Sequence, residues 1–283
     1  MAKKLEDLAK KNSEITAKNT KNKIYTLDDM PTAEDLRYVE MPEWWVKGTN
    51  TKGIPFGKIV MIAGDSDSGK TSCSIAAMKA AQEQNVSVFY CETEGKTTRA
   101  DLTNWGITNK NFFFTSSSVA EEIYDLVCDF LMSRDSSEPF LVVLDSIGNV
   151  ISRHDAERSM ADSSSKPGGK GKTNREGLNK LIAMRTQRDI ALLVINYTYD
   201  NIGSPGKTNA GGKAVNFFSS LTYQTSRKAW IEKTEKGEKK RIGAKVTWKL
   251  FKNHLNRNAP GPKSIEIDIT ADGMKLAGSS NDE

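Results

Sequence analysis

The feature that most restricts the fold of this chain is a short motif between an apolar segment and a helical pattern. Residues 58–63 (KIVMIA) are almost wholly apolar, and residues 64–71 (GDSDSGKT) fit the pattern G-x-x-x-x-G-K-[ST]. A helical pattern follows over residues 71–84. In the order strand, loop, helix, such a motif turns backbone N–H groups and a helix N-terminus toward an anion. We therefore predict a nucleotide-phosphate site here, rather than a glycine turn that only caps a helix.

Each residue of this motif has an expected role. Lys70 is expected to reach the β- and γ-phosphates of ATP, and the Thr71 hydroxyl is expected to bind Mg²⁺. The other residues expected to line the nucleotide site are Gly64, Asp65, Ser66, Asp67, Ser68, Gly69 and Ser72.

Further apolar runs indicate the class of fold. Residues 86–91, 140–144 and 190–195 are continuous apolar runs, which is typical of strands buried on both faces. Helical patterns at 71–84 and 118–132 lie between them. The alternation of strand and helix predicts an α/β fold, a P-loop ATPase core with a mostly parallel twisted sheet and helices on both faces. Alternating apolar residues after about residue 214, at 246–251 and 264–269, predict an antiparallel extension at the C-terminal end.

Carboxylates follow two of these runs. Asp145 ends the run at 140–144, and an acid at the tip of a strand beside the phosphate loop is expected on the magnesium side. A turn or helix-cap aspartate is the alternative. Glu92 and Glu94 follow the run at 86–91, and strand alternation places both on one face. We expect at least one to point toward the phosphates and to position a water molecule, the alternative being two solvated glutamates.

Charge and composition limit which partners and which cell compartment we expect for this chain. The net charge is +5, with basic residues dense near the N-terminus and over residues 227–263, which fits either solubility or binding of a polyanion. We expect no membrane segment, no secretory signal, and buried free thiols at Cys73, Cys91 and Cys128, and therefore a cytoplasmic location. Residues 1–30 are predicted to be a helix and linker arm that contacts another protomer through Ile24 and Tyr25. Residues 31–275 are predicted to be the core, and 276–283 a short acidic tail.

The order of several motifs resembles that of a known family. The phosphate loop is followed by residues 91–94 (CETE), 144–149 (LDSIGN), 194–200 (VINYTYD) and 211–217 (GGKAVNF). Over about residues 50–275 this order and spacing resemble the RecA-type DNA recombinases, and the likeness is greatest to the UvsX-like recombinases of bacteriophages. The resemblance implies an ATP- and Mg²⁺-dependent enzyme that forms a filament on single-stranded DNA and pairs it with homologous duplex DNA. A phage origin would place it in the host cytoplasm.

The resemblance also assigns roles to residues. It implies that Glu94 activates water and that Asn196 ends the strand that senses the γ-phosphate, where Tyr197 replaces a glutamine of RecA. It implies two DNA-binding loops, at about 153–172 and 201–213. Their expected contacts, with one residue just beyond the first loop, are Arg153, Lys170, Lys172, Arg175, Lys207, Gly211, Gly212 and Lys213. Phe217 and Lys252 match positions at subunit contacts, and Lys252 with His254 match positions that reach the neighbour's nucleotide.

Two other functions remain open at this point. The chain could be an ATP- and DNA-binding mediator or filament module with little hydrolysis, because Tyr197 and Asp101 depart from the family pattern. A ring-forming motor with the same core is the second alternative. DNA-stimulated phosphate release separates the recombinase from the mediator, and images of filaments or rings separate it from the motor.

Overall fold

A computed structural model describes residues 26–28, 30, 32, 34–159, 169–185, 188–210, 213–235, 237–255 and 264–278 of this chain. Its contacts divide the chain into two units, Met1–Arg37 and Tyr38–Glu283. The sheets and helices described here belong to the second unit. Ile24 and Tyr25, predicted to contact another protomer, lie outside the described residues.

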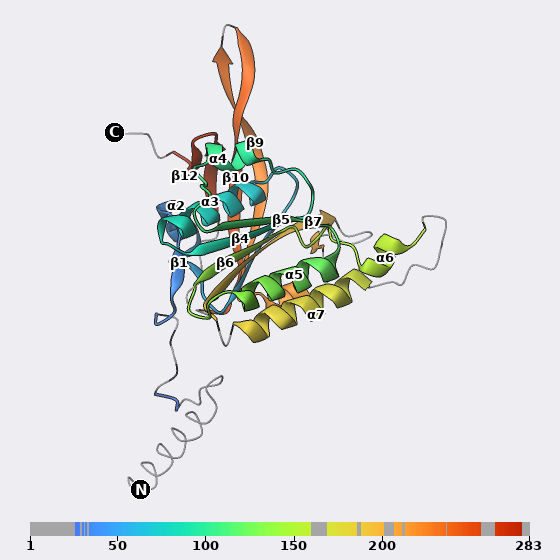
Figure 1. Ribbon diagram of the computed structural model, residues 1–283. Helices are drawn as coiled ribbons and strands as arrows, with labels where there is room; N and C mark the ends of the chain where they lie inside the picture. The colour runs from blue at the N-terminus through green and yellow to red at the C-terminus, as the bar shows by residue number, and fades with distance from the viewer. Residues whose placement is uncertain are drawn as a thin grey trace. The chain divides into compact units, whose positions relative to one another are not determined.

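A large, mixed sheet forms the centre of the second unit (Figure 1). Its strands follow the order β12-β11-β10-β9-β3-β7-β6-β4-β5, and β8 pairs with β7. From β9 to β5 the neighbouring strands are parallel, and from β9 to β12 they are antiparallel, which confirms the predicted fold class. The strands of this sheet are β3 (Ile59–Gly64), β4 (Ser87–Glu92), β5 (Phe112–Ser116), β6 (Phe140–Asp145), β7 (Ile190–Asp200), β8 (Lys207–Asn209), β9 (Leu221–Glu235), β10 (Glu238–Asn253), β11 (Ile265–Thr270) and β12 (Gly273–Leu276). A separate two-stranded sheet pairs β1 (Tyr38–Glu40) with β2 (Gly53–Pro55).

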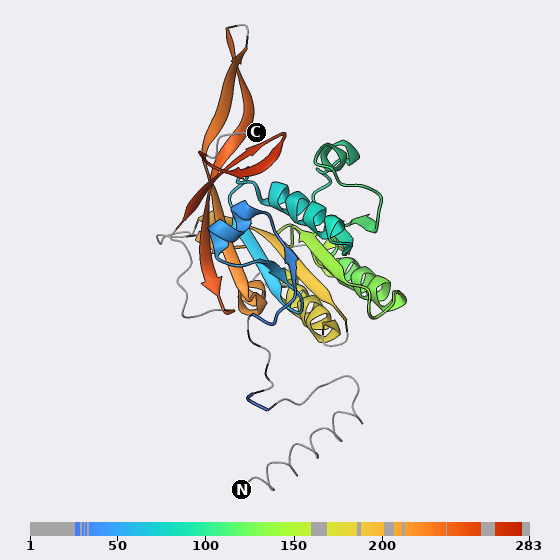
Figure 2. The ribbon, with the colours of Figure 1, turned by 90° about the vertical axis from the view of Figure 1, so that its left-hand side faces the viewer.

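Helices cover both faces of the sheet, as Figure 2 shows. The helices of this unit are α2 (Glu43–Thr49), α3 (Lys70–Glu83), α4 (Arg99–Asn104), α5 (Ala120–Ser133), α6 (Arg153–Glu157), α7 (Gly169–Met184) and α8 (Lys213–Phe218). The side chains of β3 explain why its sequence is continuously apolar. Val60 and Ile62 pack in the core with α3, whereas Ile59 and Met61 pack in the other core with α5 and α7.

The two long strands β9 and β10 form a hairpin that extends away from the rest of this unit (Figures 1 and 2). At its base, Tyr223 and Trp248 are buried and pack against Trp45 of α2, with ring centroids 5.0–5.7 Å apart. Farther out, two arginines contact the Trp230 ring, with the Arg227 and Arg241 guanidinium carbons 4.3 and 4.9 Å from its centroid. The basic stretch from residue 227 thus begins on a solvent-exposed ribbon.

Three predictions of local structure need correction. The predicted first loop, 153–172, begins with helix α6 and ends inside helix α7. The predicted second loop, 201–213, contains strand β8, and β7 continues through Asn196 to Asp200 because β8 pairs with its last residues. Cys73 and Cys91 are buried free thiols, but Cys128 is only half-buried. Among the described residues no helix combines the length and apolar character that a membrane span requires.

Candidate functional site

The predicted phosphate loop joins β3 to α3 at the carboxyl end of the parallel strands. Gly69 has φ +82°, a left-handed conformation that suits glycine, and the next residue, Lys70, begins α3. A Cβ on Gly64 would lie 2.2 Å from the Thr225 carbonyl oxygen, so β9 approaches the loop too closely for a side chain there. The Ser68 hydroxyl lies 2.7 Å from both the Asp65 carbonyl oxygen and the Thr225 hydroxyl. These contacts fix the backbone of the loop in an open conformation at the start of α3.

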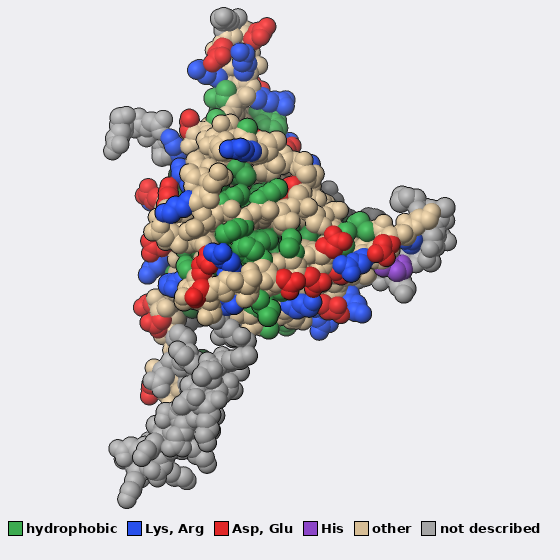
Figure 3. Space-filling view, in the orientation of Figure 1, with side chains coloured by type: hydrophobic (Ala, Val, Ile, Leu, Met, Phe, Trp, Pro, Cys, Tyr) green, Lys and Arg blue, Asp and Glu red, His purple; other side chains and the backbone are tan. Residues whose placement is uncertain are grey.

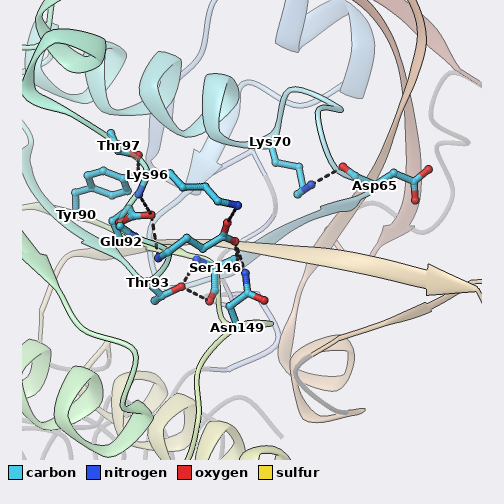
Figure 4. A network of polar contacts seen from close by, with 11 residues as sticks. Asp65, Lys70, Tyr90, Glu92, Thr93, Lys96, Thr97, Ser146 and Asn149 are labelled. Carbon is cyan, nitrogen blue, oxygen red and sulfur yellow. Dashed lines mark hydrogen bonds and ion pairs between the residues drawn. The ribbon is translucent and has the colours of Figure 1, made fainter.

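A polar cavity of about 550 Å³ opens at this loop. The phosphate loop with the start of α3, the segment after β4, the end of β6 with the segment after it, and β7 line this cavity. The lining residues are Ser66, Asp67, Ser68, Gly69, Lys70, Thr71, Ser72, Glu94, Lys96, Asp145, Ser146, Asn149 and Tyr197. Lys70 donates to the Asp65 carbonyl oxygen at 2.6 Å, and burial lowers its pKa although nearby carboxylates oppose that shift. Figure 4 shows the Lys70 ammonium group directed to the Asp65 carbonyl oxygen, to one side of the group formed by Lys96, Ser146 and Asn149. The cavity therefore brings together most residues that the sequence placed around the phosphates.

Asp145 fits the requirements of a divalent-cation ligand. It is 6% exposed, and its Oδ2 has no hydrogen-bond partner among the described residues. Burial raises its pKa to about 6; a hydrogen bond from Thr71 and the charge of Lys70 oppose this, whereas Glu94 and Glu92 add to it. The Asp145 oxygen that accepts no hydrogen bond from the described residues and the neighbouring Thr71 hydroxyl are oxygen ligands of the kind that Mg²⁺ prefers at a phosphate site. The residues therefore fit the predicted cation.

The two glutamates after β4 do not face the same way, contrary to the strand alternation expected for them. Glu92 is 4% exposed, and its carboxylate accepts hydrogen bonds from the backbone N–H groups of Glu94, Gly95 and Lys96. The chain turns at Gly95, whose φ is +65°, and β4 ends at Glu92, so alternation does not extend to Glu94. Glu92 stabilises this turn, whereas Glu94 lines the cavity.

Three donors surround the Glu94 carboxylate. Lys96 forms an ion pair with Oε2 at 2.5 Å, while the Ser146 hydroxyl, at 3.1 Å, and the Asn149 amide donate to Oε1. Burial opposes ionisation of Glu94, but Lys96, Ser146 and Asn149 together hold its pKa below the usual value. The side chains of Lys96 and Asn149 were not singled out by the sequence. Asn149 lies 55 residues away, and no local pattern connects it to Glu94.

Asn196 and Tyr197 occupy different environments. Asn196 is fully buried and donates to the Ala210 carbonyl oxygen at 2.7 Å, so its side chain contacts the base of the second loop and does not line the cavity. Tyr197 lines the cavity and donates its hydroxyl to the Gly148 carbonyl oxygen at 3.0 Å. Of the two predicted γ-phosphate sensors, only Tyr197 faces the phosphate loop.

A second cavity continues from the first and shares Thr71 and Asp145 with it. Trp105, at the end of α4, is half-buried in its wall. Asp101, which departs from the family pattern, also lines this cavity and closes a capping box with Thr98 at the start of α4. Trp105 thus supplies an aromatic ring beside the nucleotide site four residues farther along the chain.

The predicted DNA contacts are distributed unevenly. Arg153 is exposed on α6, and Lys172 and Arg175 are exposed on α7, whereas Lys170 is half-buried and donates to the Gly148 carbonyl oxygen at 2.6 Å. In the second loop, Gly211 and Gly212 lie outside the described residues, as do the side chains of Lys207 and Lys213.

The predicted subunit-contact residues lie apart from the phosphate loop. Phe217 is 78% exposed on α8. Lys252 donates to the carbonyl oxygens of Asn216 and Phe217, at 2.6 and 3.3 Å, at the end of that helix. His254 is exposed, and neither it nor Lys252 lines the phosphate cavity of its own subunit.

Comparison with known proteins places this geometry in a family. Residues 10–274 match the family described as the RecA N-terminal domain. Protein RecA of Sulfurovum sp. (strain NBC37-1) is 25% identical over 221 residues, which cover 77% of this chain and 60% of that protein. Protein RecA of Malacoplasma penetrans (strain HF-2) is 27% identical over 220 residues, which cover 77% of this chain and 63% of that protein. Protein RecA of Streptomyces rimosus is 28% identical over 221 residues, which cover 77% of this chain and 55% of that protein. The matches thus span 55–63% of these relatives' own length. Because the family match extends over nearly the whole chain, from before β1 into β12, the chain belongs to the RecA family.

Proposed function

We propose that this protein is an ATP-dependent DNA recombinase that forms a filament on single-stranded DNA and promotes pairing and strand exchange with a homologous duplex. The observation that carries this proposal is the cavity in which the phosphate loop, Asp145 and Glu94 meet at one edge of the sheet. Membership of the RecA family supports it. The proposed place of action is the cytoplasm, and for a phage-encoded protein the cytoplasm of the host.

In this proposal the nucleotide is bound through main-chain and side-chain donors. The backbone N–H groups at the start of α3 have no acceptor within the helix and would bind the phosphates. Lys70 would exchange the Asp65 carbonyl oxygen for phosphate oxygens, and Thr71 with Asp145 would hold Mg²⁺. When bound, the cation neutralises charge that develops on the phosphates. The base would extend toward Trp105.

Hydrolysis would depend on Glu94. An ionised carboxylate at the cavity wall can accept a proton from a water molecule placed in line with the γ-phosphate. Glu94 is ionised at neutral pH, since its pKa lies below the usual value. The hydrogen bonds of Glu92 to the backbone of the turn support Glu94, rather than Glu92, in this role.

Single-stranded DNA is proposed to bind at the two loops that follow β6 and β7. Both strands end at the same edge of the sheet as the phosphate loop, because β3, β6 and β7 are parallel. Exposed Arg153, Lys172 and Arg175 supply positive charge beside the first loop. Contacts of this kind go to phosphates and carry no base information, which suits a protein that binds any sequence.

For assembly, we expect the arm of one copy to add a strand to the sheet of another. Among the described residues, β5 pairs only with β4 and so presents an open edge. Phe114 of β5 is 50% exposed, and a groove beside it is lined by Leu102, Ile107 and Phe112. Figure 3 shows hydrophobic side chains gathered across the face on which Figure 1 draws α5 and β5. The apolar residues Ile24 and Tyr25 would suit such an edge.

The test of the proposed activity is the substitution Lys70→Ala. It should abolish phosphate release in the presence of single-stranded DNA and weaken nucleotide binding. Lys79→Ala, on the outer part of the same helix, is the matched control and should keep both. Phosphate release that persists at the wild-type rate in Lys70→Ala would remove this cavity from the chemistry.

The mediator remains a second candidate because of one observation. The Glu94 carboxylate already accepts three donors, an arrangement that weakens it as a base. Wild-type protein that binds ATP and single-stranded DNA, but releases no phosphate above the level of Lys70→Ala, would favour the mediator. Rings in place of filaments in negative-stain images would favour the motor.

A further inference from the structure

Lys170, a predicted DNA contact, and Tyr197 of β7 both donate to one carbonyl group. The carbonyl oxygen of Gly148 accepts a hydrogen bond from Lys170 at 2.6 Å and another from the Tyr197 hydroxyl at 3.0 Å. Lys170 lies at the end of the predicted first loop, the part that forms the first turn of α7, and Tyr197 lies on β7, shortly before the predicted second loop. The segment that follows β6 is therefore held by one residue of the predicted first loop and by one residue of the strand that leads into the second.

The fit around Gly148 is close. A Cβ there would lie 2.5 Å from Cε1 and 2.7 Å from Cδ1 of the Tyr197 ring, so only glycine lets the ring lie against the backbone. The preceding residue is fixed as well, because the backbone N–H of Ile147 donates to the Ile195 carbonyl oxygen at 3.1 Å. A movement of Tyr197 or Lys170 must therefore shift the backbone around Gly148.

The next residue, Asn149, contacts the proposed water-activating group. Its amide donates to Oε1 of Glu94, as does the Ser146 hydroxyl from the other end of the same segment. Hydrogen bonds to a carboxylate make it a weaker base. The segment 146–149 thus connects the two DNA loops to Glu94.

We propose that Asn149 is a positioning residue that holds Glu94 in a weakly basic state, and that single-stranded DNA releases this hold by drawing Lys170 away from the Gly148 carbonyl. This inference rests on the proposed function. Lys170 is the residue through which DNA acts because its side chain is half-buried and its ammonium group donates to a neutral carbonyl oxygen. A DNA phosphate offers that ammonium group a stronger, charge-assisted hydrogen bond. Once Lys170 leaves, Tyr197 alone holds Gly148, and Asn149 can move off Glu94.

The direct test is Lys170→Met, measured by phosphate release with and without saturating oligo(dT). Loss of the hydrogen bond from Lys170 to the Gly148 carbonyl should raise the kcat measured without DNA by about fivefold, the change expected for net removal of one hydrogen bond. KM for ATP should be unchanged. The ratio of DNA-stimulated to DNA-free kcat should fall by the same factor. Lys170→Arg keeps a donor and a charge and should restore the wild-type ratio.

A matched control comes from the same helix. Lys180→Met removes the same charge from the far end of α7, where the side chain pairs with Asp125 at 2.9 Å, and should behave as wild type. Tyr197→Phe, which deletes only the hydroxyl that donates to Gly148, should raise the DNA-free kcat as Lys170→Met does.

The outcomes distinguish this inference from the proposed function. If oligo(dT) stimulates phosphate release by the wild type, and Lys170→Met has the same ratio of DNA-stimulated to DNA-free kcat, the coupling is overturned. The recombinase proposal would then still stand. Equal changes in Lys170→Met and Lys180→Met would also overturn it, because the effect would then come from charge alone. A wild-type protein with no DNA-stimulated phosphate release would overturn both.

Discussion

Acidification should weaken binding of the magnesium–nucleotide complex, because Asp145 takes up a proton. Burial raises the pKa of Asp145 to about 6, and its Oδ2 has no hydrogen-bond partner among the described residues. A cation binds the ionised carboxylate and not the acid, so protonation and Mg²⁺ binding compete at this side chain.

The size of the effect follows from the pKa of Asp145. With a value of about 6, the ionised fraction is about 0.9 at pH 7 and about 0.1 at pH 5. Affinity for the complex should therefore fall about tenfold over this range, or about 1.4 kcal/mol. The effect on folding has the opposite sign. The pKa of Asp145 is raised from 3.8, so its contribution to stability is fully present below about 3.8 and is lost as the pH rises through about 6.

The assay compares wild type with Asp145→Asn by isothermal titration calorimetry with Mg·ADP at pH 7, 6 and 5. The ratio of the variant's Kd to that of wild type should fall about tenfold between pH 7 and pH 5. Titration of the nucleotide's own phosphates cancels in this ratio. With EDTA in place of Mg²⁺, acidification should instead tighten wild-type binding relative to the variant, since a neutral Asp145 no longer repels the phosphates.

A ratio that stays constant with pH in the presence of Mg²⁺ would refute the reasoning. It would mean either that Asp145 is ionised throughout this range or that the cation lies elsewhere. Circular dichroism at each pH shows whether both proteins remain folded, so that weaker binding is not confused with unfolding.

Other outcomes follow from the same site and its surroundings. Glu94→Gln should keep ATP binding but stop phosphate release. Glu92→Gln should instead lower the melting temperature, because the Glu92 carboxylate stabilises the turn. Loss of turnover from Glu92→Gln alone would mean that Glu92, and not Glu94, activates the water. Neutralising Lys207 and Lys213 together should weaken DNA binding equally for all sequences. It should also reduce the slope of log affinity against log salt by about 0.7 for each phosphate that is no longer bound. An unchanged slope would remove the second loop from the DNA site. Deletion of residues 1–30 should leave a folded, ATP-binding monomer without filaments or DNA-stimulated hydrolysis, as sedimentation with ATP and single-stranded DNA would show; filaments of full length from the truncated protein would reduce the arm to a solubility tail.

The sequence was sufficient wherever the determinant is local. The phosphate loop is continuous in the chain, and its glycines, lysine and threonine act through backbone geometry that neighbouring residues set by themselves. The buried strands were also predictable, because burial on both faces requires an unbroken apolar run, as at Ile59–Gly64. The strand ends then placed Asp145 at the same edge as the loop.

The sequence was insufficient wherever tertiary packing overrides local preference. Residues 169–172 (GKGK) favour a loop, yet they form the first turn of α7. Asn174, Gly177 and Leu178 are buried on that helix, and the Tyr124 ring of α5 packs so closely that a Cβ on Gly177 would lie 2.1 Å from it. This packing fixes the helix and extends it toward its polar N-terminal end.

The sequence by itself determined the class of fold and the position of the phosphate site, because both depend on patterns within short stretches of the chain. Only the tertiary structure decided that the two carboxylates after β4 face different ways, since a turn after Glu92 redirects the chain and sets Glu94 against Asn149. It also decided that Arg227 of the hairpin pairs with Asp67 of the phosphate loop, at 3.0 Å and 160 residues apart. Contacts between distant segments depend on how strands are ordered in the sheet, and no periodicity within one segment contains that order.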